Sequence, residues 1–320
     1  MDLTSLYYFS EVAKDLHITK TANRLFISQQ TLSNHILRLE QFYGAKLLYR
    51  KPKLTLTDAG EQVLLFAQKL NQEQTNLTDV LSDIGNQKRG VIRFGAGTMR
   101  MNILSEILPE FYQKYPYAEL RLSSYVSTGL ESKVLDGELD FAISISEESK
   151  PELIEEHLMA DQIYLCVHDR LLYQYYGAEA EALKRKAIAG ANVADFSRLP
   201  FCIFTNRMGN LLRSCFEEAG VVPQTRMTTQ YTQICTEQGF RGLMAIFASQ
   251  ANLVNRMEQI PQELNIFPMF YQGEPMYLQV SLIRHRQRYL TQMSKYLLNL
   301  LITHASQTEQ KTISRIAGKA

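Results

Sequence analysis

Short polar side chains are concentrated between residues 28 and 38, and their chemistry suits hydrogen bonding to nucleic-acid bases. A glutamine such as Gln29 can form paired bonds to adenine, while hydroxyl and guanidinium groups bond base edges or phosphate oxygens. A helix face that is merely solvated usually carries Glu and Lys, whereas the residues found here lower helix propensity. Their presence therefore indicates a function. The residues expected to contact nucleic acid are Ser28, Gln29, Gln30, Thr31, Ser33, Asn34 and Arg38.

A basic turn follows these residues. Leu47–Tyr49 and Leu54–Leu56 have the pattern of a hairpin, and the turn between them carries Arg50, Lys51 and Lys53. A charged turn by itself is usually only solvated, but after a polar helix it is typical of a wing whose cations neutralise phosphates. The first 57 residues hold eight Lys and Arg against four Asp and Glu, a net charge of +4, whereas the whole chain is at +1. This asymmetry favours a polyanionic partner for the N-terminal segment.

Three helices must position the polar face. Apolar residues recur on one side of Leu3–Ala13, which predicts a first helix. A short second helix is expected from Thr19, as its N-cap, to about Phe26, and Ser28 is a good N-cap for the third. The buried stripe of the third helix consists of Leu32, Ile36, Leu39 and Tyr43, and Gly44 ends the helix. With the hairpin, this pattern predicts an all-α, winged helix-turn-helix domain at the N-terminus.

Residues 58–88 are expected to form one long linker helix. No proline occurs between Asp58 and Asn86, and apolar residues alternate by four and three, as in a coiled-coil seam. The alternative is a helix packed on its own domain, but the N-terminal domain is small for a helix of this length. A dimer seam is the better interpretation, since it would place two recognition helices on two half-sites. The residues expected at the dimer contact are Val63, Leu70, Leu77, Leu81 and Ile84, with Gln74 as a polar interruption.

Strand-like and helix-like segments alternate beyond residue 88, which predicts an α/β fold with largely parallel sheets. The expected strands are Val91–Gly95, Leu120–Tyr125, Phe141–Ile145, Ile163–Val167, Phe201–Phe204, Leu243–Phe247 and Tyr277–Ile283. The expected helices are Met101–Tyr115, Thr128–Leu135, Ala178–Ala187, Leu211–Ala219 and Gln230–Gln238.

Ligands of such folds bind at the carboxyl ends of strands, against helix N-termini. Hydroxyl caps and free backbone N–H groups recur at these places and favour a small anionic ligand, with which Arg100 could pair. For each hydroxyl taken alone, ordinary helix capping is the simpler interpretation. The residues expected to bind the ligand are Thr98, Met99, Arg100, Ser127, Thr128, Thr205, Asn206 and Thr229.

Catalytic and metal-binding patterns are absent from the sequence. It has no Gly-x-Ser-x-Gly turn, no HExxH and no phosphate-binding loop, and Gly95–Arg100 lacks the third glycine of a dinucleotide site. The four cysteines form no CxxC pair, so we expect buried thiols in a reducing cytoplasm, with a Cys202–Cys215 redox pair as the alternative. No apolar stretch is long enough to span a membrane, and the first residues lack the pattern of a secretion signal. We therefore expect a cytoplasmic protein without catalytic residues, cofactor or metal.

The motifs of the first sixty residues resemble those of the LysR-type transcriptional regulators. They are Phe9-Ser10-Glu11-Val12-Ala13, Thr21-Ala22-Asn23-Arg24-Leu25, Ser28-Gln29, Leu32-Ser33, Ile36 with Leu39-Glu40, Gly44, Leu47-Leu48-Tyr49-Arg50, and Leu56-Thr57 with Ala59-Gly60. Two positions depart from the family: Gln30 replaces the usual proline, and Leu37 stands where a basic residue is common. Both should alter the preferred DNA sequence rather than the fold. Val91–Ile145 resembles the effector domain of the same family, and the resemblance is looser beyond it.

The resemblance implies a bacterial regulator whose effector domain has two lobes, similar to periplasmic binding proteins, with chain crossings near Gln162–Leu165 and Ile266–Phe270. The expected domains are 1–57 for DNA binding, 58–88 for the linker, 89–303 for the effector and 304–320 for a polar tail, with lobe 1 at about 90–161 and 269–303 and lobe 2 at about 162–268. The expected partners are double-stranded DNA with palindromic half-sites, a small effector, further copies in dimers and tetramers, and RNA polymerase. The alternatives are an enzyme with a DNA-binding head and an architectural DNA binder.

Overall fold

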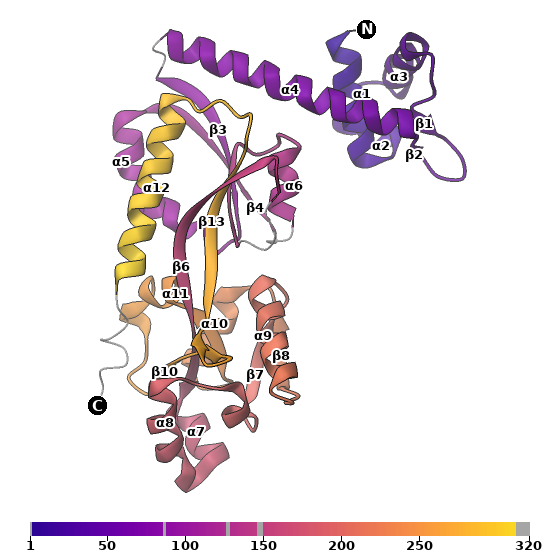
Figure 1. The fold of residues 1–320 in the computed structure, drawn as a ribbon. Coiled ribbons are helices and arrows are strands. Elements are labelled where there is room, and N and C mark those ends of the chain that lie inside the picture. Colours follow the sequence, from indigo (N-terminus) through magenta and orange to yellow (C-terminus); the bar gives the residue numbers. More distant parts are fainter. Residues whose placement is uncertain (1, 86–87, 126–128, 146–149, 312–320) are drawn as a thin grey trace. The chain divides into compact units, whose positions relative to one another are not determined.

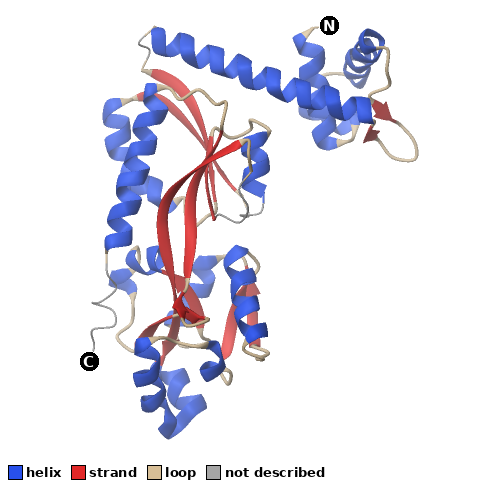
Figure 2. Cartoon of the chain, in the orientation of Figure 1, coloured by secondary structure: helices blue, strands red, loops and turns tan. Residues whose placement is uncertain are grey.

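The computed structural model describes residues 2–85, 88–125, 129–145 and 150–311 (Figure 1). The chain divides into two compact units, Met1–Gly85 and Asn86–Ala320. Helices dominate the first unit, whereas the second combines helices with long strands (Figure 2). Within the described residues, no helix is both long and apolar enough to cross a membrane.

Three short helices form the body of the first unit: α1 (Leu3–Asp15), α2 (Ile18–Arg24) and α3 (Gln29–Tyr43). Phe9 of α1 is fully buried in one core with Leu32 and Ile36 of α3. Ser28 caps α3 by accepting a hydrogen bond from the Thr31 N–H at 3.0 Å, and Gly44 ends it in the left-handed conformation at φ 63°. The predicted beginning and end of this helix are thereby confirmed.

The second helix differs from the prediction at its start. His17 Nδ1 accepts the Lys20 N–H at 3.2 Å, so His17 rather than Thr19 is the N-cap of α2. The Thr19 hydroxyl instead donates to Gln29 Oε1 of α3 at 3.1 Å. The expected hairpin is present, with β1 (Leu48–Tyr49) antiparallel to β2 (Thr55–Leu56).

Helix α4 (Asp58–Ile84) is continuous over 27 residues. The Thr57 hydroxyl caps it by accepting the Gly60 N–H at 2.9 Å. Its first turns pack on α1 and β2, and Val63 is buried in the core of this unit. Val63, expected at a dimer contact, is therefore occupied within its own domain. The last turns are different, because Leu77, Leu81 and Ile84 are exposed.

The first lobe of the second unit contains a parallel sheet. Its strands β3, β4 and β5 pair in the order β5-β3-β4, with Phe94 of β3 opposite both Phe141 and Leu122. Helices pack on this sheet with the large apolar side chains of the strands between them. The elements are β3 (Arg89–Ala96), α5 (Asn102–Lys114), β4 (Tyr117–Ser124), α6 (Leu130–Leu135), β5 (Phe141–Ile145) and α12 (Gln292–Gln310).

Two long antiparallel strands, β6 (Leu153–His168) and β13 (Tyr277–His285), connect the two lobes (Figure 1). Strand β6 pairs with β13 in its first part and with β9 and β10 in its second. In the second lobe β7 and β8 pair in parallel, and a short hairpin of β11 and β12 precedes β13. The second-lobe elements are α7 (Asp169–Tyr176), α8 (Ala180–Ala189), β7 (Pro200–Phe204), α9 (Arg207–Glu218), β8 (Gln224–Thr229), α10 (Thr232–Phe240), β9 (Ile246–Ser249), α11 (Gln250–Val254), β10 (Leu264–Pro268), β11 (Phe270–Tyr271) and β12 (Glu274–Pro275).

Several expectations for the second unit were incomplete. Helices α7, α11 and α12 were not predicted. The expected second crossing at Ile266–Phe270 is wrong, because β10 lies entirely in the second lobe. The chain returns to the first lobe through β13 instead. Residues 304–310 of the expected polar tail belong to α12, whose inner face buries Leu301, Ala305 and Thr308. Residues 312–320 lie outside the described part.

Candidate functional site

The polar residues of α3 are gathered on its solvent face. Leu32, Ile36 and Leu39 take up the buried side of the helix. Ser33 is half-buried, and the other six residues expected to contact nucleic acid are exposed: Ser28, Gln29, Gln30, Thr31, Asn34 and Arg38. The structure therefore places all seven together, and most of them lie within the first two turns of one helix.

The basic turn is equally accessible. Arg50, Lys51 and Lys53 are exposed in the loop that joins β1 to β2 and projects from the N-terminal unit (Figure 1). The N-terminal unit therefore presents a helix with hydrogen-bonding side chains and a separate cationic loop. In protein–DNA complexes, base recognition and phosphate contact are divided between groups of these two kinds.

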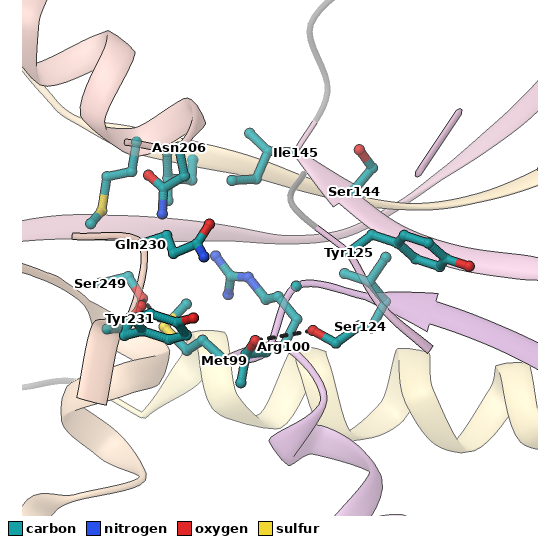
Figure 3. Close-up of a pocket in the computed structure, with 16 residues that line it drawn as sticks. Met99, Arg100, Ser124, Tyr125, Ser144, Ile145, Asn206, Gln230, Tyr231 and Ser249 are labelled. Carbon is teal, nitrogen blue, oxygen red and sulfur yellow. Dashed lines mark hydrogen bonds between the residues drawn. The ribbon is translucent and has the colours of Figure 1, made fainter. Parts of the chain in front are cut away.

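The second unit contains a cavity of about 230 Å³ between its lobes (Figure 3). Four of the predicted ligand residues line it, namely Thr98, Met99, Arg100 and Asn206. Thr205 and Thr229 do not line it; the Thr205 N–H bonds the Thr229 carbonyl, and the Thr229 hydroxyl accepts the Tyr231 N–H. Ser127 and Thr128 lie outside the described residues. The further lining residues are Gly97, Ser124, Tyr125, Ile143, Ser144, Ile145, Met208, Gln230, Tyr231, Thr232, Ser249 and Leu278.

Some of the lining residues that were not predicted also lie at the carboxyl ends of strands, the position from which the predicted ligand residues were chosen. Ser124 and Ser144 stand at the carboxyl ends of β4 and β5, which is where ligands of parallel sheets bind. Ser249 obeys the same rule, since it ends β9 and is the N-cap of α11, whereas Leu278 does not, because it lies near the start of the crossing strand β13.

A buried ion pair supports the cavity. Arg100 Nη1 lies 2.5 Å from Asp161 Oδ2, and the two side chains are 11% and 0% exposed. Asp161 Oδ1 also accepts the Ala251 N–H at 2.9 Å, so this carboxylate of β6 bonds the first lobe and the start of α11 at once. The Nε and Nη2 groups of Arg100 are buried and have no hydrogen-bond partner among the described residues. The guanidinium points into the cavity (Figure 3).

Buried donors without partners are costly, typically by about 1–3 kcal/mol each or more when charged. Such donors persist where a ligand or water completes their bonds. Asn206 adds to this polarity, since it caps α9 by accepting the Gly209 N–H at 3.1 Å and brings the positive end of that helix to the cavity. The first turn of α9 packs closely against the end of β7, and this requires glycine at position 209, because a Cβ there would lie 1.8 Å from the Phe204 carbonyl oxygen. The arrangement suits a ligand with an anionic, hydrogen-bond-accepting group.

The cysteines take no part in this site. All four are buried, and burial raises the pKa of the Cys215 thiol to about 11. Cys215 Sγ lies 3.8 Å from the Met276 sulfur, so its neighbour is a thioether. Cys202 instead shares a hydrogen bond with Cys235, which lowers the pKa of Cys202. The described residues contain no cluster of metal-ligating side chains.

A helix-turn-helix unit with an exposed polar helix, followed by a two-lobed domain with a ligand-sized cavity, defines a DNA-binding regulator with an effector domain. Residues 3–61 match the bacterial regulatory helix-turn-helix proteins of the lysR family, and residues 85–306 match the LysR substrate binding domain. The chain belongs to the LysR family of transcriptional regulators. This family consists of regulators rather than enzymes, so the enzyme alternative falls away.

The curated relatives are similar to different extents of the chain. The transcriptional activator IlvY of Salmonella typhimurium is 33% identical over 153 residues, which are 47% of this chain and 52% of that protein. The regulator CzcR of Bacillus subtilis is 23% identical over 308 residues, which are 95% and 98% of the two chains. The chain thus spans about half the length of the first of these relatives and nearly all of the second.

Solved structures share the fold across almost the whole chain. A full-length OxyR variant from Pseudomonas aeruginosa has a TM-score of 0.64 at 18% identity and covers 95% of this chain and 94% of its own. Full-length LysG from Corynebacterium glutamicum, with bound effector Arg, has a TM-score of 0.61 at 14% identity and covers 96% and 99%. CbnR in complex with its target DNA has a TM-score of 0.54 at 17% identity and covers 96% and 100%.

Neutralising Asp161 should destabilise the second unit. Asp161→Asn keeps the shape but leaves the Arg100 charge buried without its counter-ion, and breaking a buried pair in this way typically costs about 3–5 kcal/mol. We expect its urea unfolding transition, followed by circular dichroism, to move to lower denaturant. The double variant Arg100→Gln with Asp161→Asn should recover part of the loss.

A matched control is Glu119→Gln, which removes the carboxylate of the exposed Arg121–Glu119 pair. Exposed pairs contribute about 0–1 kcal/mol. If Asp161→Asn and Glu119→Gln unfold at the same urea concentration, the Arg100–Asp161 pair does not have the role assigned to it.

Proposed function

We propose that this LysR-type regulator recognises palindromic half-sites with the first turns of α3 and senses a small anionic metabolite in the cavity between its effector lobes. The observation that carries the sensing half is the buried guanidinium of Arg100, which points into the cavity with two unbonded donor groups. Binding would shift the populations of lobe arrangements and thereby alter the DNA complex. Selection of bound sequences from random DNA, with and without candidate ligands, tests both halves.

Base recognition belongs to the N-terminal end of α3. Gln29, Gln30 and Asn34 are exposed amides that can bond adenine in pairs, and Ser33 and Thr31 are smaller hydroxyl groups on the same helix. The free backbone N–H groups of the first turn suit a phosphate. Arg38 and the wing cations Arg50, Lys51 and Lys53 contact phosphates, so they contribute affinity without sequence preference.

Two substitutions should separate these roles. Gln29→Ala should weaken binding to the selected sequence by about 1–3 kcal/mol and leave random DNA unaffected. Lys51→Ala should weaken both and lower the slope of log affinity against log salt by roughly 0.9. Fluorescence anisotropy at several salt concentrations measures both effects.

The control for the amide is Gln41→Ala, which is exposed on the same helix but about three turns away from its start. It should bind both DNAs as the wild type does. An equal loss for Gln29→Ala on selected and random DNA contradicts base recognition by Gln29, and an unchanged salt slope for Lys51→Ala contradicts the wing assignment.

Dimerisation through α4 would supply the second half-site. Leu77, Leu81 and Ile84 follow one another by four and three residues and are exposed, and large apolar side chains in such a row are typical of a coiled-coil contact. Leu70 is half-buried and packs partly against its own domain, so it offers less surface to a second copy than these three. Assembly of dimers into tetramers, and contact with RNA polymerase, complete the proposal.

A charge in this row should separate the chains. Leu77→Asp places a carboxylate in the apolar contact of both copies, so we expect sedimentation velocity to show a monomer. Thr78→Asp introduces the same charge at the adjacent exposed position and should remain dimeric. A dimer for both variants would remove α4 as the dimer contact.

The cavity suits small carboxylates. Its volume of about 230 Å³ fits a small ligand, and Met99, Ile143 and Leu278 provide apolar walls around the polar groups. We expect one or more aliphatic or aromatic monocarboxylates to raise the melting temperature of the full chain. At a ligand concentration of a hundred times the dissociation constant, binding should stabilise the folded state by about 2.7 kcal/mol. The corresponding primary amides, which carry no charge, should not.

The Arg100→Gln, Asp161→Asn double variant tests the role of the guanidinium without leaving a charge buried alone. The carboxylate that stabilises the wild type should not stabilise this variant. Equal stabilisation by a carboxylate and its amide, or an undiminished response of the double variant, would show that Arg100 does not select an anion.

A further inference from the structure

Arg207 crosses from the second lobe into the first. It is the first residue of α9, and its side chain is 7% exposed. Its Nη2 lies 2.8 Å from Oε1 of Glu131 in α6, a residue of the first lobe that is 14% exposed. Its Nη1 donates to the Ser144 hydroxyl at 2.6 Å and to the Ile145 carbonyl at the end of β5. One guanidinium of the second lobe thus bonds three acceptors of the first.

The acceptors on the first lobe form a prepared site. The Ser144 hydroxyl donates to Glu131 Oε1 at 2.7 Å, so Glu131, Ser144 and Arg207 are one hydrogen-bonded network. Burial by itself raises the pKa of Glu131, but the hydrogen bonds from Ser144 and Arg207 outweigh it and hold that pKa below the usual range. Glu131 is therefore a carboxylate at neutral pH, and its charge balances that of Arg207.

The network adjoins the cavity on both lobes. Asn206 and Met208, which flank Arg207 in the chain, line the cavity from the second lobe. Ser144 and Ile145, which accept the Arg207 bonds, line it from the first. The Arg207 contacts therefore join the two walls directly and help to set their separation. Without the contacts, the lobes would be held by the crossing strands and by the bonds that Asp161 and Gln250 make elsewhere.

We propose that Arg207 is a cross-lobe latch, a positioning residue that holds the effector lobes at the spacing in which the cavity can bind its ligand. The inference rests on the proposed function, in that the cavity is taken to be the sensing site. The latch acts before the ligand arrives, since it raises the fraction of molecules in the binding-competent arrangement, and apparent affinity scales with that fraction. Removing either partner would leave the other charge without its counter-ion, so a substitution of Arg207 or of Glu131 should weaken the latched arrangement.

The spacing of the lobes can be measured in the full chain without any ligand. Spin labels at Gln113→Cys in α5 and Arg185→Cys in α8 would report the distance between the lobes, because both positions are exposed and the four native cysteines are buried. Labelled chains are diluted with unlabelled ones, so that distances within one chain dominate. Pulsed electron–electron double resonance then gives the distance distribution.

The latch predicts one narrow distance for the parent protein. Arg207→Met should lose this distance as the major population and show a broader distribution. Glu131→Gln, which keeps the shape of the first-lobe acceptor but removes its charge, should shift in the same direction. Arg207→Lys should be intermediate, since a lysine can pair with Glu131 but cannot bond all three acceptors.

The matched control is Arg213→Met. Arg213 lies on the same helix, but its bonds to Phe204 and Asn210 stay within the second lobe. It should retain the parent distribution. If Arg207→Met and Glu131→Gln retain the parent distribution while folding normally, the latch is refuted. A protein that shows the latch but responds to no carboxylate would refute the proposed sensing function and leave the latch standing, so the two failures are distinguishable.

Discussion

The effector domain depends on the carboxylate of Asp161, which has no solvent exposure and stands where β6 leaves the first lobe. A buried charge of this kind is tolerated only when its partners are in place. Arg100 from the first lobe and the Ala251 N–H at the start of α11 supply them. The strand crossing, the position of α11 and the direction of the Arg100 guanidinium are thus fixed by one group.

The N-terminal unit shows the opposite strategy. Leu32, Ile36 and Leu39 of α3 are buried in its interior, whereas most of the polar face of the helix lies outside the core and can vary without disturbing it. Gln30 and Leu37, where the sequence departs from the usual family pattern, are both exposed. Under the proposed function, they would change the DNA sequence that is preferred without a cost to folding. Specificity would then be separable from stability in this unit, whereas in the effector domain the groups at the cavity also hold the lobes together.

What could be predicted from the sequence follows the same division. Ser28 and Gly44 bound α3 through local chemistry, and the first-lobe cavity residues follow from the rule that ligands bind at the carboxyl ends of parallel strands. Asp161 and Arg207 carry no local signal, because their partners lie 61 and 76 positions away in the chain. The end of helix α12 was predicted as a polar tail, because its last turns carry polar residues. Only the three-dimensional structure shows that Thr308 in these turns is buried.

The charged groups at the cavity and those in the basic loop differ in burial, and therefore in the range and salt dependence of their interactions. At the cavity each buried guanidinium has its own carboxylate, Asp161 for Arg100 and Glu131 for Arg207, so these pairs add no net charge. Under the proposed function, an anion entering there would be selected by charge-assisted hydrogen bonds from the unbonded donors of Arg100, a close-range interaction that salt screens weakly. Arg50, Lys51 and Lys53 are exposed instead, and under the proposed function their attraction to phosphates would be long-ranged and sensitive to salt. Effector affinity and DNA affinity should therefore respond differently to ionic strength, which lets the ligand response persist under conditions that weaken non-specific DNA binding.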